Sequence, residues 1–332
     1  MENSETNIDP AVAANTADTP LAAARFIKEI GRGKNGARSL SREDAQLLYA
    51  AMLEQRVSDL ELGAILLAMR VKGESVDEVS GFLKAAEASF TALTAPAGDY
   101  APVVIPSYNG SRRVANLTPL LALLLAREGV PVLVHGVTKD PGRVASAEIF
   151  QALGYAPARN AAEASARFAA RQPVFMAIDV LAPKMARLLA MRRILGVRNS
   201  THTLVKIMQP FAQPALRLTS YTHPEYFAML SAYFRGEPSR GDAFLMRGTE
   251  GETVANARRA QQIDWFHQGV HTQLVEKQAA VEALPDLPAQ NDAISTASWI
   301  EAVLRNEIAV PAPIADQVRH CVTVARALRA LD

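Results

Sequence analysis

Apolar and polar positions along the chain follow two different periods, and the change falls near residue 92. Over residues 21–92 apolar residues recur every three to four positions, which predicts amphipathic helices. A serine precedes an acid by three residues at Ser41, Ser58 and Ser75, and this spacing indicates three helix starts. We therefore expect residues 21–92 to form a small N-terminal helical domain.

Beyond the turn-rich stretch that follows residue 92, strand-like and helical patterns alternate. Helical periodicity is found over residues 117–129 and 144–154. Apolar runs typical of strands buried on both faces occupy residues 102–110, 130–136, 173–179, 215–223 and 242–248. Such alternation predicts an α/β domain with a mostly parallel sheet flanked by helices, over residues 98–182 and 213–332. The helical residues 183–212 between them are expected to join the N-terminal helical domain.

Composition narrows the class of protein. The single cysteine, Cys321, lies in an apolar helical stretch and is expected in the core, and the sequence has no zinc-type Cys–His spacing, which favours a reducing cytoplasm. Residues 1–20 carry acids but no base, so we expect a disordered tail rather than a targeting signal. The longest apolar run, residues 117–126, is well short of the roughly 20 residues that cross a bilayer. A membrane protein is excluded on this basis.

The total charge is nearly balanced, at +1, but its distribution is uneven. Residues 183–217, called here the basic segment, contain no acid, and residues 28–38, the N-terminal basic cluster, contain only Glu29. Cations gathered without acids produce a strong local positive potential and favour an anionic partner. The cations are Lys184, Arg187, Arg192, Arg193, Arg198, Lys206 and Arg217 in the segment, and Lys28, Arg32, Lys34 and Arg38 in the cluster.

Three separated stretches, residues 60–75, 130–154 and 181–204, resemble the anthranilate phosphoribosyltransferase family in the order in which that family has them. In the family, the second stretch reads Val-Pro-Val-x-Lys-His-Gly-Asn-Arg. The third is similar to its segment ending in Val-Arg-x-x-Leu-Gly-x-Arg-Thr. The resemblance implies the phosphoribosyltransferase and nucleoside phosphorylase type of fold, glycosyltransferase family 3, with a cleft between the two domains and dimerisation through the helical domain.

The family's phosphoribosyl site is degenerate in this sequence. The pyrophosphate loop Gly-Thr-Gly-Gly-Asp binds through bare backbone amides, whereas here a single glycine remains and Tyr108 would crowd such a contact. Val134 and Val137 stand where the family has its lysine and asparagine. The resemblance places the degenerate site at Ser107, Tyr108, Asn109, Gly110, Asn116, His135 and Gly136.

The family's magnesium site, an adjacent Asp-Glu pair, is replaced by Thr253 and Val254. Carboxylate oxygens are the ligands that magnesium requires, so we expect no metal and no cofactor. A shift in register would instead bring Glu250 and Glu252 to that place, and magnesium belongs to this alternative. Arg192 coincides with the family's anthranilate-contacting arginine, unless it is kept for packing or pairing across the cleft.

The sequence resembles most closely the DNA-binding branch of the family, which lacks the transferase motifs; residues 27–38 and 245–252 carry this likeness. That resemblance implies a cytoplasmic homodimer that binds DNA or RNA, single-stranded or duplex, with little sequence preference. The binding residues expected are Lys184, Arg187, Arg192, Arg193, Arg198, Lys206, Lys28, Arg32, Lys34 and Arg38, and no catalytic residue is expected.

Three alternatives remain open at this point. The cations of the basic segment pair with acids elsewhere in the fold, or they bind a small phosphorylated ligand, or the chain is an active glycosyltransferase of the pentosyltransferase kind with an altered substrate. Aromatic residues are sparse, so the tyrosines Tyr108, Tyr221 and Tyr226 are candidates for base stacking but are better interpreted as core or wall. His202 and His223 have no partner at the spacing of a catalytic triad.

Overall fold

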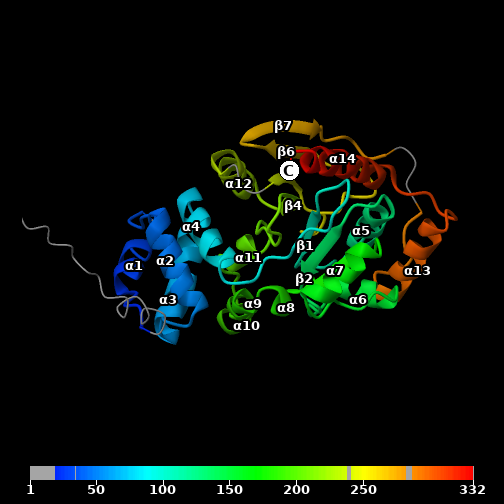
Figure 1. Cartoon of the computed structure of the whole chain (residues 1–332). Helices are drawn as coiled ribbons and strands as arrows, with labels where there is room; N and C mark the ends of the chain where they lie inside the picture. Colours follow the sequence, from blue (N-terminus) through cyan, green and yellow to red (C-terminus); the bar gives the residue numbers. More distant parts are fainter. Residues whose placement is uncertain (1–18, 34, 238–240, 282–285, 332) are drawn as a thin grey trace, which may run out of the picture.

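The computed structural model describes residues 19–33, 35–237, 241–281 and 286–331. The predicted tail largely falls on residues 1–18, which lie outside the described residues. The N-terminal helices are α1 (Ala24–Ile30), α2 (Arg42–Leu53), α3 (Asp59–Lys72) and α4 (Val76–Glu87), gathered at one end of the molecule (Figure 1). Ser41, Ser58 and Ser75 are the N-caps of α2, α3 and α4, which confirms the three helix starts.

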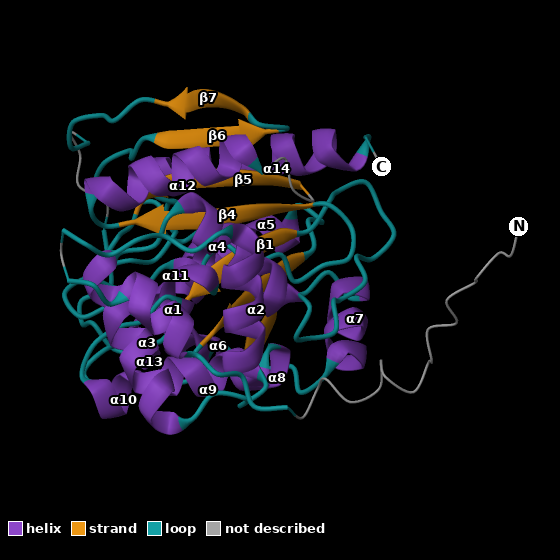
Figure 2. Cartoon of the chain, turned by 90° about the vertical axis from the view of Figure 1, so that its left-hand side faces the viewer, coloured by secondary structure: helices purple, strands orange, loops and turns teal. Residues whose placement is uncertain are grey.

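The larger domain contains one seven-stranded sheet, and Figure 2 shows its strands β4 to β7 running side by side across the upper part of the view. Its order is β3-β2-β1-β4-β5-β6-β7. The strands are β1 (Val103–Ser107), β2 (Val132–Gly136), β3 (Val174–Ala177), β4 (Ala215–Tyr221), β5 (Gly241–Arg247), β6 (Ile263–His267) and β7 (Val270–Val275). Strands β1 to β5 pair in parallel, as predicted, whereas β6 and β7 pair antiparallel. The expected α/β class with a mostly parallel sheet is confirmed.

Helices cover both faces of this sheet, because successive strand residues point to opposite sides. In β1, Val104 packs into the core shared with the helical domain, while Val103 and Ile105 pack into the core on the other face. The covering helices are α5 (Thr118–Arg127), α6 (Ser146–Ala152), α7 (Ala161–Ala169), α12 (Pro224–Gly236), α13 (Ala293–Leu304) and α14 (Ala312–Arg329). Cys321 of α14 is buried. None of the helices among the described residues is long and apolar enough to cross a bilayer.

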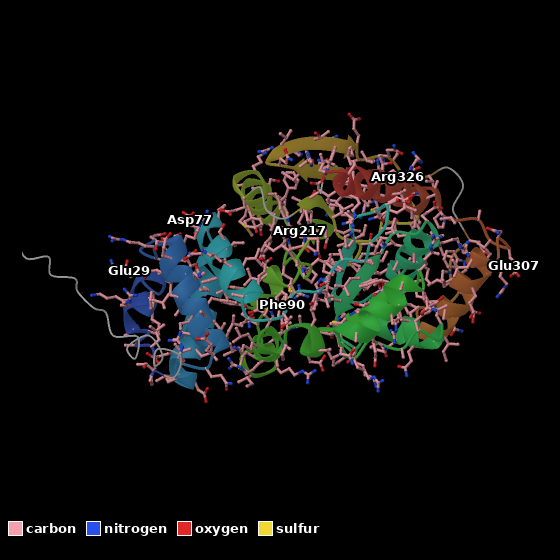
Figure 3. The ribbon with its side chains drawn as sticks, in the orientation of Figure 1. Glu29, Asp77, Phe90, Arg217, Glu307 and Arg326 are labelled. Atoms are coloured by element: carbon pink, nitrogen blue, oxygen red, sulfur yellow. The ribbon has the colours of Figure 1, made fainter. Side chains whose placement is uncertain are left out.

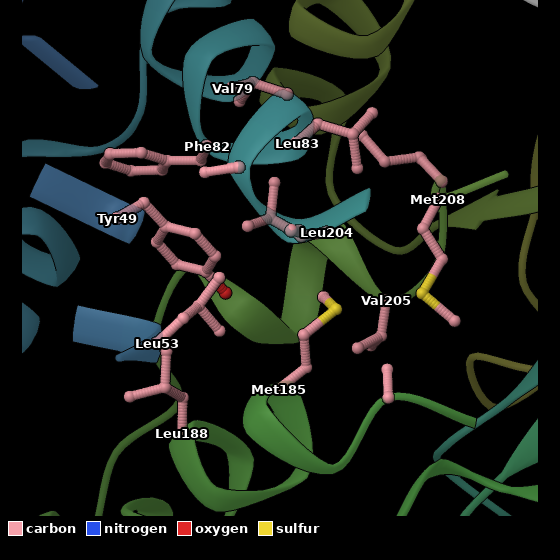
Figure 4. Close-up of a cluster of buried hydrophobic side chains, with 14 of the residues drawn as sticks. Tyr49, Leu53, Val79, Phe82, Leu83, Met185, Leu188, Leu204, Val205 and Met208 are labelled. Carbon is pink, nitrogen blue, oxygen red and sulfur yellow. The ribbon is translucent and has the colours of Figure 1, made fainter. Parts of the chain in front are cut away.

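Four short helices connect the two domains. They are α8 (Ile178–Leu181), α9 (Pro183–Ala190), α10 (Arg192–Leu195) and α11 (Thr201–Leu204). Figure 4 shows apolar side chains of α9 and α11 packed against α2 and α4, with Met185 and Leu204 facing Tyr49 and Phe82. The hydroxyl groups of Tyr49 and Thr201 are hydrogen-bonded at 2.8 Å, and burial raises the pKa of Tyr49. The basic segment is therefore anchored to the helical domain by a packed core.

The strand order reverses between β1 and β4. Connections from β1 lead through β2 to β3 on one side, and β4 then lies on the other side of β1. In open α/β sheets, ligands bind outside the carboxyl ends of the strands at such a switch point. The loops that follow β1 and β5 meet there, and both carry residues that the sequence analysis singled out.

Candidate functional site

A carboxylate from the loop after β5 is bound by the loop after β1. The side chain of Glu252 is only 1% exposed. Its Oε1 accepts hydrogen bonds from the backbone amides of Asn109 and Gly110 at 2.9 and 2.8 Å. The hydroxyl of Thr118, the first residue of α5, lies 3.4 Å from Oε2. Two adjacent amides and a helix N-terminus form an anion-binding nest, and the anion in this nest belongs to the chain itself.

The two loops fit together closely around Gly251. The side-chain amide of Asn109 donates to the carbonyl of Gly251 at 2.8 Å, and the hydroxyl of Ser220 donates to the same carbonyl at 2.9 Å. Gly251 has a φ of +95°, and a Cβ atom there would lie 2.4 Å from Nδ2 of Asn109. Only glycine fits this position. Arg198 donates to Oδ1 of Asn109 at 2.8 Å, which links the nest to the basic segment.

The polar residues expected at the degenerate phosphoribosyl site bond to one another. The hydroxyl groups of Ser107 and Ser146 are 2.7 Å apart, and both residues are buried. The side-chain amide of Asn116 donates to Oγ of Ser146 at 3.0 Å, and its Oδ1 accepts from the amide of Thr118 at 3.2 Å. These groups are therefore satisfied within the fold without a ligand.

Tyr108 and His135 form a hydrogen-bonded pair at the ends of β1 and β2. The hydroxyl of Tyr108 and Nδ1 of His135 are 2.8 Å apart. Burial lowers the pKa of His135 to about 3 and raises the pKa of Tyr108 well above its ordinary value. At neutral pH the imidazole is therefore neutral, and its tautomer determines whether Nδ1 accepts from the hydroxyl of Tyr108 or donates to it. Gly136, next in β2, lies against Ser107, so the strands approach closely here.

The carboxylate of Glu250 is also engaged by backbone amides. It accepts from the amide of Arg113 at 3.0 Å and from the amide of Arg112. Both carboxylates named in the magnesium alternative, Glu250 and Glu252, are thus engaged by backbone amides of the loop after β1. Within the described ranges, no group of three or more histidine, cysteine, aspartate and glutamate side chains has the geometry of a metal site.

Two pockets open on either side of His202 in the cleft between the domains. The apolar pocket has a volume of about 480 Å³. The polar pocket has a volume of about 140 Å³. Residues lining the apolar pocket include Tyr108, Val137, Ile178, Leu189, Arg192 and Arg193. Residues lining the polar pocket include Arg70, Arg198, Thr203, Lys206, Tyr221 and Tyr226.

The basic segment contributes unequally to this cleft. Arg192, Arg193, Arg198 and Lys206 line the two pockets, and Lys184 is exposed on α9 outside them. Arg187 donates instead to the carbonyls of Met52 and Leu53 at the end of α2. Arg217 is 2% exposed and donates to the carbonyl of Ile207. Figure 3 shows Arg217 within the body of the molecule.

Positive charges crowd around Arg198. Its pKa is lowered first by burial and then by the nearby arginines Arg192, Arg143 and Arg70, against the single opposing effect of Asp140. Asp140 lies 3.9 Å from Arg192. Burial also lowers the pKa of Lys206 to about 8, opposed by Glu252. The pKa of His202 falls to about 4 through burial and the charge of Arg198, so this side chain is neutral at pH 7.

The N-terminal basic cluster lies apart from the cleft. Lys28, Arg32 and Arg38 are exposed, and Lys34 lies outside the described residues. Arg32 pairs with Glu29 at 2.8 Å, and Figure 3 shows Glu29 at the outer end of the helical domain. Within the chain the cluster and the cleft therefore lie apart.

Two cleft residues were not singled out from the sequence. Arg70, on α3, lines the polar pocket from the helical domain, and Arg143 lies close enough to Arg198 to lower its pKa. Neither has a motif, and their approach depends on how the two domains pack. Glu252 was noted only as a metal ligand after a register shift, because the sequence does not show that a carboxylate fills the nest.

Comparisons with known proteins agree with this architecture. Residues 24–89 match the helical bundle domain of a glycosyl transferase family. The chain is 46% identical over 301 residues to the uncharacterized protein YbiB of Escherichia coli (strain K12), covering 90% of this chain and 92% of that protein. It is 30% identical over 186 residues to anthranilate phosphoribosyltransferase of Methylocella silvestris, where the match spans 56% of this chain and 51% of the enzyme. The chain thus matches about half the length of that enzyme.

Solved structures show the same fold. The crystal structure of anthranilate phosphoribosyltransferase from Thermus thermophilus superposes with a TM-score of 0.67 at 22% identity, covering 92% of this chain and 89% of that one. The Saccharomyces cerevisiae enzyme in complex with PRPP and Mg superposes with a TM-score of 0.63 at 13% identity, covering 93% and 94%. At these identities the likeness concerns the fold alone.

Proposed function

The chain belongs to the anthranilate phosphoribosyltransferase-like family, glycosyltransferase family 3, and from this premise we propose that it is a nucleic-acid-binding protein rather than a transferase. Its partner is DNA or RNA, bound with little sequence preference and chiefly through phosphates. The binding surface is the wall of the cleft formed by Arg192, Arg193, Arg198 and Lys206. A cytoplasmic location, where nucleic acid is abundant, remains part of this proposal.

The observation that carries the proposal is the crowding of cations around Arg198. Like charges gathered in one place destabilise the fold unless something anionic neutralises them. Asp140 is the one acid that raises the pKa of Arg198, against three arginines that lower it. A polyanion supplies the missing negative charge without requiring a shaped pocket, because phosphate contacts need no base recognition.

The internal carboxylate of Glu252 argues against phosphoribosyl transfer. A transferase stabilises departing pyrophosphate with donors and metal ions aimed at the developing charge. Here the amides of Asn109 and Gly110 are already bound to Glu252. A phosphate group would have to displace a buried carboxylate before it met these donors.

The alternative is an active glycosyltransferase with an altered substrate, and the apolar pocket favours it. A volume of about 480 Å³ lies within the range of small-molecule sites, and Arg192 on its wall suits a carboxylate. The backbone amides of the nest are not free to bind a phosphate. A phosphorylated second substrate therefore has no site beside this pocket. We therefore retain nucleic-acid binding as the better supported function.

We also propose a homodimer formed through the helical domain. A groove of about 310 Å³ on this domain is lined by Ile27, Ala64, Leu67, Ala68 and Val71. Leu67 is 51% exposed and Val71 is 68% exposed. Such an apolar surface is typical of a protein interface, and a second copy of the chain would cover it.

The proposal is tested by mobility-shift titrations with one sequence prepared as single-stranded DNA, duplex DNA and RNA across a range of salt. Binding through phosphates predicts that log affinity falls linearly with log salt, by about 0.7 to 0.9 per phosphate contacted. Unrelated sequences should bind alike. Absence of binding to all three at low salt, together with stabilisation by magnesium and phosphoribosyl pyrophosphate, would favour the transferase instead.

A further inference from the structure

The polar pocket lies between elements that are distant in the sequence. Arg70 reaches it from α3 in the helical domain, and Arg198 and Lys206 reach it from either side of α11. The end of β4 and the start of α12 close the remaining side, with Ser220 and Thr222 in the lining. The pocket is therefore built from both domains and is separate from the nest that Glu252 fills.

Cations exceed acids in this lining. Arg70, Arg198 and Lys206 are opposed within the pocket by Glu74 alone. Among the contacts of the described residues, the ammonium of Lys206 makes no hydrogen bond; burial and Arg198 disfavour its charge, and Glu252, outside the pocket lining, favours it. The first turn of α12, whose N-cap His223 provides no side-chain cap, adds the positive end of a helix. An anion in the pocket would satisfy these groups together.

The size of the pocket restricts the anion. Its volume of about 140 Å³ is below the roughly 300 Å³ at which small-molecule sites begin, so it admits one charged group rather than a whole ligand. A phosphate monoester ends in such a group and carries close to two negative charges at neutral pH. A phosphodiester within a nucleic-acid strand carries one charge, and the strand must leave the pocket on two sides.

We propose that the polar pocket binds the terminal phosphate of a phosphate monoester, held by Arg70, Arg198 and Lys206. The source is the 5′-phosphorylated end of a nucleic-acid strand or a small phosphorylated compound. In the first case the inference rests on the proposed function and extends it, since the pocket then distinguishes strand ends from strand interiors. In the second case the pocket binds the small compound whether or not the protein binds nucleic acid.

The test compares two single strands of one sequence that differ only in a 5′-phosphate, by fluorescence anisotropy. The phosphorylated strand should bind about tenfold more tightly, the effect of charged hydrogen bonds to one group. Arg70→Ala should bring the ratio of the two affinities close to one. Lys139→Ala, which removes an exposed cation at the rim of the apolar pocket, should leave that ratio unchanged.

A pH series tests the role of Lys206. The preference for the phosphorylated strand should decline from pH 7.5 to 9.5, because Lys206 loses its proton near pH 8 while the monoester keeps both charges. Lys206→Arg should keep the preference across this range, since guanidinium stays charged. A preference that declines equally in Lys206→Arg would contradict this assignment.

Inorganic phosphate and a nucleoside monophosphate separate the two sources. If neither strand binds but both compounds raise the melting temperature of the parent and not of Arg70→Ala, the pocket is confirmed and the proposed function fails. If both strands bind equally and neither compound stabilises the parent, the pocket proposal is overturned while the proposed function stands.

Discussion

The backbone amide of Asn109 donates a 2.9 Å hydrogen bond to Oε1 of Glu252, 143 residues further along the chain. This bond joins the loops after β1 and β5 across the switch point of the sheet. It also gives the nest an anion that cannot diffuse away. A site suited by its backbone to phosphate has thereby become a structural contact.

Replacing Glu252 by Ala should lower the free energy of unfolding by about 1 to 3 kcal/mol, because the amides of Asn109 and Gly110 lose their buried acceptor. The empty nest should then accept inorganic phosphate or pyrophosphate. Either ion should raise the melting temperature of the Glu252→Ala variant, measured by calorimetry, by more than it raises that of the parent.

Glu252→Gln is the matched control, because it keeps an acceptor oxygen and fills the same space without charge. Phosphate should not stabilise this variant beyond the parent. Equal stabilisation of the parent and both variants would mean that phosphate binds only outside the nest and that removing Glu252 does not open an anion site.

The homodimer is tested at Leu67, which is half exposed on the groove of the helical domain. Leu67→Glu places a charge in the expected interface, where burial would cost several kcal/mol, and should shift the mass from dimer to monomer at micromolar concentration. Light scattering measures the mass. Ile294→Glu is the control, since Ile294 is 74% exposed on α13 at the opposite end of the molecule. A parent that is already monomeric would contradict the proposal.

Local signals were enough to predict much of the fold. Ser41, Ser58 and Ser75 did start helices, and the five apolar runs became β1 to β5. The antiparallel strands β6 and β7 were not predicted. Most residues of β7 are exposed or half exposed, so it lacks the apolar run that indicates a buried strand.

The site was less predictable, because its groups come from separate elements. Arg187 and Arg217 resemble the other cations of the basic segment, yet one bonds to the end of α2 and the other is buried beside Phe234. Arg70 joins the pocket only through the packing of the two domains. Charge along a sequence indicates the sign of a surface but not which side chains face it.

His135 should contribute to acid sensitivity. Its pKa is about 3 in the fold, against an ordinary value near 6.5, so between these pH values the unfolded chain binds more protons. The stability due to neutral His135 is present above pH 6.5 and is lost as the pH falls towards 3. Between pH 7 and pH 4 the unfolding free energy should fall in both proteins. The fall should be smaller by roughly 2 to 3 kcal/mol in His135→Gln, which keeps an acceptor for Tyr108, than in the parent.

Urea unfolding at several pH values measures this difference. His223→Gln removes an exposed histidine and is the control, with a pH dependence expected to follow the parent. If His135→Gln also follows the parent, other groups determine the acid sensitivity.

The basic wall of the cleft is tested by replacing Arg192 and Arg193 together with Ala. Both side chains are exposed, and the ion pair between Arg192 and Asp140 is long at 3.9 Å, so the fold should keep its melting temperature. Affinity for unrelated strands should weaken alike, and the slope of log affinity against log salt should flatten by about 0.7 to 0.9 for each phosphate that the variant no longer neutralises.

Alanine at Lys28, Arg32 and Arg38 removes positive charge from the N-terminal basic cluster instead and serves as the comparison. If binding runs along the cleft, this triple variant keeps the parent slope while the Arg192 and Arg193 variant does not, because a phosphate contact releases counterions only where it is made. The reverse result would move the binding surface to the outer end of the helical domain. There the cluster lies beside the apolar groove, so a dimer formed through that groove would bring two copies of it together.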